Sequence, residues 1–137
     1  MTGRWICPRC EREFDRPHQA HTCAPGVSVE SWFAGRPPGD RAIYDAIMER
    51  LPGDVHVDAV SVGVFLKAQR KIAELRPRAR GRMALYLVLP RPLDSPRAGR
   101  AEKISTERWG HRITLSGPGD VDDELGEWIA EAYAAAS

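Results

Sequence analysis

The chain has 137 residues, 42% of them hydrophobic and 28% charged, which is enough to bury the core of one domain and too apolar for a disordered chain. Its longest apolar runs are strand-sized, far below the roughly 18 to 20 consecutive residues that a membrane-spanning helix needs, and the N-terminus lacks the apolar stretch of a secretion signal. We therefore expect no membrane-spanning segment and a cytoplasmic location.

Residues 5–25 are poor in core-forming side chains and hold all three cysteines. Cys7 and Cys10 are separated by two residues, so two thiolates can approach one ion from a single turn, and His21 with Cys23 supplies a second pair. An odd number of clustered cysteines in a reducing cytoplasm favours metal over a disulfide scaffold. The spacing predicts a structural Zn²⁺ site with three thiolates and one imidazole.

The fourth zinc ligand has two candidates. His21 is favoured by its spacing from Cys23, and His18 is the alternative. A redox pair of cysteines would stand at the head of a helix that follows a strand, and no strand-rich segment precedes Cys7. Because four protein ligands leave no position for water, we expect this zinc to hold the segment in shape and not to catalyse a reaction.

An N-terminal helix is predicted after a proline-rich break. Residues 28–33 fit a single helical turn, and the paired prolines and the glycines of residues 34–39 exclude helix there. Apolar residues spaced four apart then predict a helix over about 41–51, with Asp40 as its N-cap.

Short apolar runs separated by polar turns predict four or five antiparallel strands between residues 55 and 115. The segment 94–101 looks like an exposed loop, and a C-terminal helix capped by Gly119 or Asp120 follows the last strand. The predicted fold class is α+β: an antiparallel sheet flanked by an N-terminal and a C-terminal helix, preceded by a small CCHC zinc ribbon. The predicted strands begin near Val55, Val60, Ile72, Met83 and His111.

The net charge of +1 conceals an asymmetry along the chain. From Lys67 to Arg112, thirteen Lys and Arg residues stand against four acids, whereas residues 113–137 hold six acids and no base. A basic surface attracts nucleic acid by releasing counterions, without reading base sequence. The candidate contact residues are Lys67, Arg70, Lys71, Arg76, Arg78, Arg80, Arg82, Trp109 and Arg112.

Other interpretations of this segment stay open. Arginine fills surface positions in any arginine-rich proteome, and Phe65, Tyr86 and Trp109 stand in apolar runs, where core packing is the usual outcome. His56 and His111 are candidate general bases, but neither has a nucleophile or carboxylate partner at a recognisable spacing. Since no GxSxG, P-loop, GxGxxG or HExxH motif occurs, we favour a function without catalysis.

Two parts of the chain resemble known families. Trp5-Ile-Cys-Pro-Arg-Cys10 with Gln19-Ala-His-Thr-Cys23 resembles the zinc-ribbon leader of many small actinobacterial proteins, and this resemblance places the fourth ligand at His21. Phe33-Ala-Gly-Arg-Pro37 and Asp120-Val-Asp-Asp-Glu-Leu125 are similar to the family called domain of unknown function 5655. That resemblance implies an α+β domain, found alone or fused to other bacterial domains, and carries over no catalytic residue. We expect two parts, the zinc-ribbon leader over 1–26 and the α+β domain over 27–137.

The predicted function is a zinc-containing binding module that contacts nucleic acid through its basic surface. The first alternative is a protein-interaction module that pairs with a partner protein or forms a homodimer. The second is a component of a nucleic-acid-processing or defence system with another activity.

Overall fold

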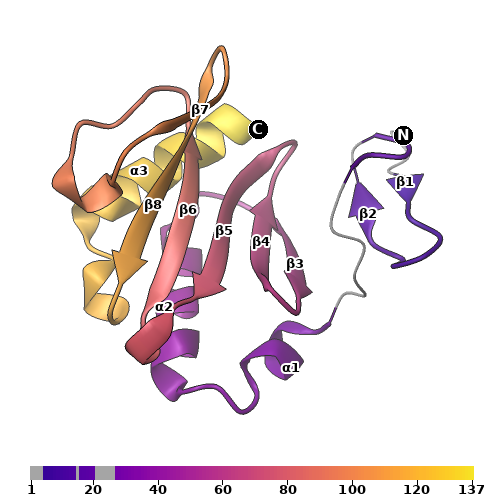
Figure 1. The fold of residues 1–137 in the computed structure, drawn as a ribbon, viewed down its shortest axis with the longest axis horizontal. Helices are drawn as coiled ribbons and strands as arrows, with labels where there is room; N and C mark the ends of the chain where they lie inside the picture. The colour runs from indigo at the N-terminus through magenta and orange to yellow at the C-terminus, as the bar shows by residue number, and fades with distance from the viewer. Residues whose placement is uncertain (1–4, 15, 21–26) are drawn as a thin grey trace.

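The computed structural model describes residues 5–14, 16–20 and 27–137. It contains two β-sheets, three α-helices and three short 3₁₀ turns (Figure 1). The helices are α1 (Val29–Phe33), α2 (Pro38–Arg50) and α3 (Asp123–Ala136), and the 3₁₀ turns are η1 (Ala79–Gly81), η2 (Pro96–Ala98) and η3 (Pro118–Asp120). The strands are β1 (Trp5–Ile6), β2 (Glu13–Phe14), β3 (His56–Val60), β4 (Gly63–Lys67), β5 (Lys71–Pro77), β6 (Met83–Leu89), β7 (Glu102–Ser105) and β8 (Arg108–Leu115). None of the described helices is both long and apolar enough to cross a membrane.

The larger sheet has six antiparallel strands in the order β3-β4-β5-β6-β8-β7, and β1 with β2 forms a separate hairpin. Helices α2 and α3 cover one face of the large sheet, and the other face carries no helix (Figure 1). The predicted α+β class with an antiparallel sheet is confirmed. The strand number is higher than the predicted four or five because β7 has four exposed residues, so no apolar run marks it in the sequence.

Alternation along the strands builds the core on the helix-covered face. Leu85 and Leu87 of β6 and Ile113 of β8 lie on this face and belong to the core cluster. They pack against Leu125 and Ile129, which lie one helical turn apart on α3. All five side chains are almost fully buried, so this layer holds the domain together.

Helix α2 begins earlier than predicted, and Asp40 is not its cap. Pro37 is the N-cap residue and Pro38 occupies the first turn. Proline fits there because the first-turn N–H groups have no partner within the helix. Asp40 is instead buried inside the first turn, and burial raises the pKa of its carboxyl group, opposed by Arg36.

The start of α3 also differs from the prediction. Asp122 is the N-cap, and its carboxylate accepts a hydrogen bond from the Leu125 N–H at 3.0 Å. Asp120, one of the two predicted caps, accepts the Ser116 N–H in the preceding turn, and Gly119 lies within η3. Asp123 and Glu124 lie in the first turn, where their negative charge is favourable beside the positive end of the helix dipole.

The segment predicted as an exposed loop between β6 and β7 is partly packed. Leu93, just before it, and Ala98 of η2 are buried in the core. The Leu93 N–H donates to Nε2 of His111 at 3.0 Å, and Nδ1 of the same ring lies 3.2 Å from the Leu87 carbonyl oxygen. His111 therefore ties the loop to the sheet through both ring nitrogens.

Candidate functional site

The face of the large sheet that carries no helix, here called the open face, has polar and aromatic side chains across its middle. The strand register places one residue from each of five strands in a continuous row. Paired residues on neighbouring strands share a face, so these five side chains lie side by side. From β3 to β8 the row is Asp58, Phe65, Glu74, Tyr86 and Arg112.

Both carboxylates of the row are buried, and each has two cationic partners. Asp58 accepts from the Nε of Arg12 at 2.9 Å and from the Nζ of Lys67 at 3.3 Å. Glu74 accepts from the Nζ of Lys71 at 2.5 Å and also from Arg76. Four cations against two acids leave this part of the open face positive.

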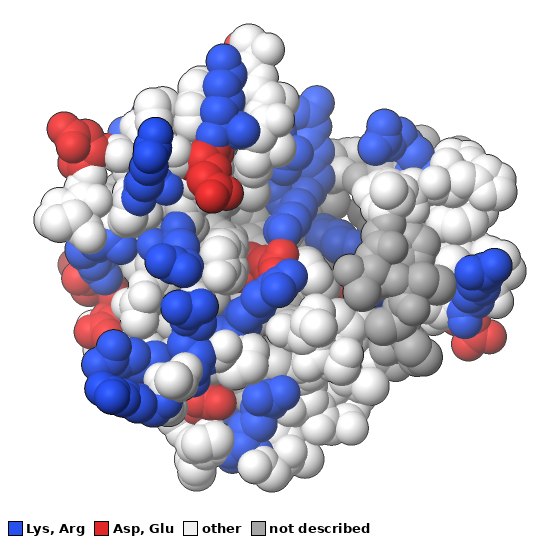
Figure 2. Space-filling model, in the orientation of Figure 1, with Lys and Arg blue, Asp and Glu red and all other residues white. Residues whose placement is uncertain are grey.

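Further arginines flank the row. Arg112 ends it, Arg108 lies farther along β8, and Arg70 lies in the turn between β4 and β5. Within the residues that the structure describes, none of these three forms an ion pair with a carboxylate. Figure 2, which faces the open face, shows Lys and Arg side chains gathered over it with few acids between them.

A second group of arginines lies at the opposite end of the open face, in the turn between β5 and β6. Arg80 there adopts a left-handed backbone with φ of 63°, which is uncommon for a residue other than glycine. The turn borders a shallow hollow of about 690 Å³ whose wall also includes Thr114 of β8. All the side chains of the turn are exposed, and its arginines are Arg78, Arg80 and Arg82.

The structure thus brings eight of the nine predicted contact residues to the open face or to the turns at its ends. Trp109 is the exception, because it pairs with Leu89, whose side chain points into the core on the helix-covered side. Its ring lies 5.8 Å from the Nζ of Lys103 on the edge strand β7. Trp109 therefore does not share a surface with the arginines.

Three cations of this surface were not among the predicted contacts. Arg108 belongs to the basic segment, and only the strand register shows which way it faces. Arg12 and Arg16 come from the leader, far away in sequence. The Arg12 guanidinium lies 5.9 Å from the Phe65 ring and forms an ion pair with Asp58 in which both side chains are only 7% exposed. No local sequence signal marks a contact between residues 46 positions apart.

The described half of the predicted metal site is a compact turn. Cys7 and Cys10 are both buried, in a small cluster with Phe14 and Trp5. The Cys7 carbonyl oxygen accepts the Glu11 N–H at 2.8 Å, which closes the turn that carries both thiols. The other two predicted ligands, His21 and Cys23, lie outside the described residues. Within the described residues, no three His, Cys, Asp or Glu side chains gather as a metal site would require.

The alternative ligand, His18, is described. Its ring packs against the indole of Trp5 with the ring centroids 5.2 Å apart. The contact places His18 beside the cluster that contains the cysteines, and gives its ring a packing role.

The two candidate general bases have different surroundings. Both ring nitrogens of His111 are occupied by backbone groups, and burial lowers the pKa of this imidazole. His56 is half-buried at the start of β3, opposite Lys67. These surroundings give His111 a structural role in the sheet.

Comparison with known proteins gives one finding. A family model described as domain of unknown function (DUF5655) matches residues 29–136. The match covers α1 to α3 with the whole large sheet and excludes the leader. Searches of curated proteins and of solved structures returned no match.

Proposed function

The chain belongs to the family described as domain of unknown function 5655, and because that description names no activity, we propose a function from the open face of the sheet. The proposed function is binding of nucleic acid, with phosphates held by the arginines and bases placed against the aromatic row. The observation that carries it is a set of arginines on one face that have no carboxylate partner among the described residues, while arginines near α3 are paired.

Single strands suit this face better than a duplex. Phe65 and Tyr86 are half-buried in the central row, and a sheet surface with aromatic rings can stack unpaired bases. Arg112 is cross-strand to Tyr86, so a phosphate contact and a stacking contact would be adjacent. A base can stack on either ring only when its own face is exposed, which the stacking within a duplex prevents.

The test is fluorescence anisotropy with single-stranded DNA, single-stranded RNA and duplex DNA of about twelve nucleotides. Binding should weaken steeply between about 50 mM and 200 mM salt, because bound cations release counterions. The double variant Arg80→Gln/Arg112→Gln should reduce the magnitude of the salt slope by about 1.4 for single strands, which corresponds to two lost phosphate contacts.

A matched control removes the same charge from the other side of the molecule. Arg41 and Arg91 are paired with Asp45 and Glu131, away from the open face. The variant Arg41→Gln/Arg91→Gln should keep the salt slope of the unaltered chain. An equal loss in both double variants would show that net charge alone matters, and no binding at about 50 mM salt would contradict the proposal.

We also propose that the leader holds a structural Zn²⁺ on Cys7, Cys10, His21 and Cys23. The support is the burial of both described cysteines on one turn, in a cluster too small to hold a hairpin by apolar burial alone. Thiolate and imidazole are the donors that structural zinc prefers, and a closed site would order the leader without taking part in a reaction.

Metal analysis after dialysis tests this site. The chain should hold about one zinc, and Cys23→Ser and His21→Gln should each lose it. His18→Gln is the matched control and should keep the metal, because His18 is proposed to pack on Trp5. Retention of zinc in His21→Gln together with its loss in His18→Gln would assign the ligand to His18.

A further inference from the structure

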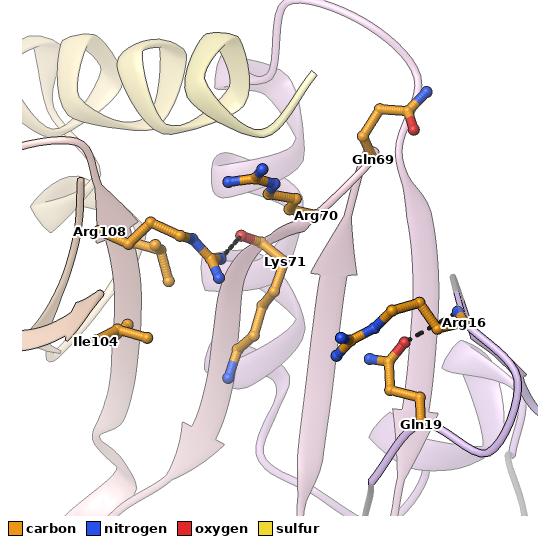
Figure 3. Close-up of a pocket in the computed structure, with 8 residues that line it drawn as sticks. Arg16, Gln19, Gln69, Arg70, Lys71, Ile104 and Arg108 are labelled. Carbon is orange, nitrogen blue, oxygen red and sulfur yellow. Dashed lines mark hydrogen bonds between the residues drawn. The ribbon is translucent and has the colours of Figure 1, made fainter. Parts of the chain in front are cut away.

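One hollow of the open face has features that the general basic surface does not explain. It lies where the β4–β5 turn, the start of β8 and the leader meet, and it has a volume of about 690 Å³ (Figure 3). Among the residues that the structure describes, its walls include four cationic side chains and no carboxylate. These cations are Arg16, Arg70, Lys71 and Arg108.

The cations of this hollow are held close together despite their mutual repulsion. The Nη2 of Arg108 donates to the Lys71 carbonyl oxygen at 3.2 Å, which points the guanidinium toward the β4–β5 turn (Figure 3). Burial lowers the pKa of Arg108, and the charge of Arg70 lowers it further. Within the described residues, neither Arg70 nor Arg108 has an ion-pair partner, so an anion bound between them would relieve this repulsion.

The backbone that carries these side chains is tied down. The Arg70 N–H donates to the Ala136 carbonyl oxygen at the end of α3, and the Arg70 carbonyl oxygen accepts the Ala68 N–H at 2.9 Å. The side chain of Lys71 is also held in place, because its Nζ donates a hydrogen bond to Glu74. The turn is therefore ordered without a ligand, and binding would have to order only the arginine side chains.

One wall of the hollow is apolar. Val88 of β6 and Ile104 of β7 line it, and Ile104 is 53% exposed. An inorganic anion would leave this wall in water. A ligand with a sugar or base attached to its charged group would cover it.

We propose that this hollow binds a phosphomonoester, with Arg70 and Arg108 on the phosphate and Ile104 against the attached nucleoside. A phosphomonoester carries a charge of about −1.5 to −2 at neutral pH, against −1 for the diester inside a strand, so the clustered cations favour a terminal phosphate. The ligand is the phosphorylated end of a nucleic-acid strand, an identity that rests on the proposed function. A free mononucleotide carries the same phosphate group and is the alternative ligand.

The test compares oligonucleotides of about twelve residues that differ only at their ends. Single strands with a 5′-phosphate, a 3′-phosphate or hydroxyl ends are titrated by anisotropy with an internal label. Either the 5′-phosphorylated or the 3′-phosphorylated strand should bind about tenfold more tightly than the strand with hydroxyl ends. A nucleoside monophosphate should compete for the site better than inorganic phosphate does.

Substitutions connect this preference to the hollow. Arg70→Gln should reduce the preference for the phosphorylated end to under about twofold, and Arg108→Gln should do the same. Arg70 serves as the safer variant, because its side chain is exposed and its backbone contacts remain. Arg112→Gln is the control, which should weaken all strands equally and preserve the preference.

The outcomes separate the two proposals. Equal affinity for all three ends, together with no competition by the monophosphate, would overturn the phosphomonoester site even if the strands bind. Failure of every strand to bind, with monophosphate binding that Arg70→Gln abolishes, would overturn the nucleic-acid function and support the site with a free nucleotide as its ligand.

Discussion

The two faces of the six-stranded sheet differ in how many of their arginines are paired with a carboxylate. On the helix-covered side, Arg50, Arg91 and Arg97 each form an ion pair with a carboxylate of α3 or of its N-cap. On the open face, Arg70, Arg108 and Arg112 have no such partner within the described residues. The acidic tail of the sequence therefore neutralises only the basic side chains that reach it, and on the open face Asp58 and Glu74 pair with four other cations.

The same contrast holds for the carboxylates. Asp122 on the helix-covered side is exposed, and its pKa is lowered by the Leu125 N–H first and by Arg97 second. Asp58 and Glu74 on the open face are buried beneath cations from the leader and from the strands. Buried acids hold the surrounding cations in place, so this face is organised as well as positive.

Two neighbouring residues of β6 give the sharpest test of the difference between the helix-covered face and the open face. Leu85 points into the core, and Tyr86 points to the open face. Leu85→Ala should lower the free energy of unfolding by about 3 kcal/mol, because it leaves a cavity in a fully buried layer. Urea unfolding measures this loss.

Tyr86→Ala is the companion variant and should lose much less stability, because the ring is only half-buried. It should instead weaken single-strand binding by about 1 to 3 kcal/mol, the value of one stacked base. A large loss of stability with unchanged binding would remove Tyr86 from the proposed interface.

Loss of the buried ion pair between the leader and the sheet should have the next largest effect on stability. Arg12→Ala removes one partner of Asp58 and leaves Lys67 as the other, so the free energy of unfolding should fall by about 2 to 3 kcal/mol. The paired variant Arg12→Met/Asp58→Leu removes both charges and should recover part of the loss. Equal losses in the two variants would show that the loss does not come from the charge left on the buried Asp58.

His111 gives the smallest expected effect, and it depends on pH. Burial first, and Arg91 as well, lower the pKa of the folded imidazole below its ordinary 6.5, while the Leu87 carbonyl and Glu131 oppose this shift. The unfolded chain then binds more protons than the folded chain, so stability is complete above about pH 6.5 and falls as the pH drops toward the folded value.

The measurement is urea unfolding between about pH 7.5 and pH 5. His111→Gln should be less stable near neutral pH, because it loses contacts to Leu93 and Leu87. It should also show a flatter dependence on pH, since the other titrating groups are unchanged. Parallel pH curves for the two chains would mean that His111 does not contribute to acid sensitivity.

Local patterns were sufficient for several elements of the fold. The apolar run that begins at His111 predicts β8, and the apolar spacing over 41–51 predicts most of α2, because each element buries one side. The hydrophobic pattern does not predict β7, because all its side chains are exposed. It also does not predict the start of α2, where Pro38 begins the helix that it was expected to exclude.

The candidate interface, too, could be predicted only in part from the sequence. The excess of basic residues marks the segment from Lys67 to Arg112, and eight of the nine predicted contact residues lie on the open face or at its ends. Counting could not separate Trp109 from Arg112, which lie three positions apart and on opposite faces, since only the pairing of β6 with β8 decides which side each occupies. Arg12 and Arg16 were missed because their contribution depends on where the leader docks.

Features that depend on near neighbours in the chain can be predicted from the sequence: the paired cysteines, the apolar stripes of the helices, the turns and the excess of basic residues in the middle of the chain. The tertiary structure decided which of those basic residues meet a carboxylate, because ion pairing depends on distances between strands and helices that are remote in sequence. The pairing of Arg91 with Glu131 and the absence of a described partner for Arg70 both follow from strand order and register, which no local pattern specifies.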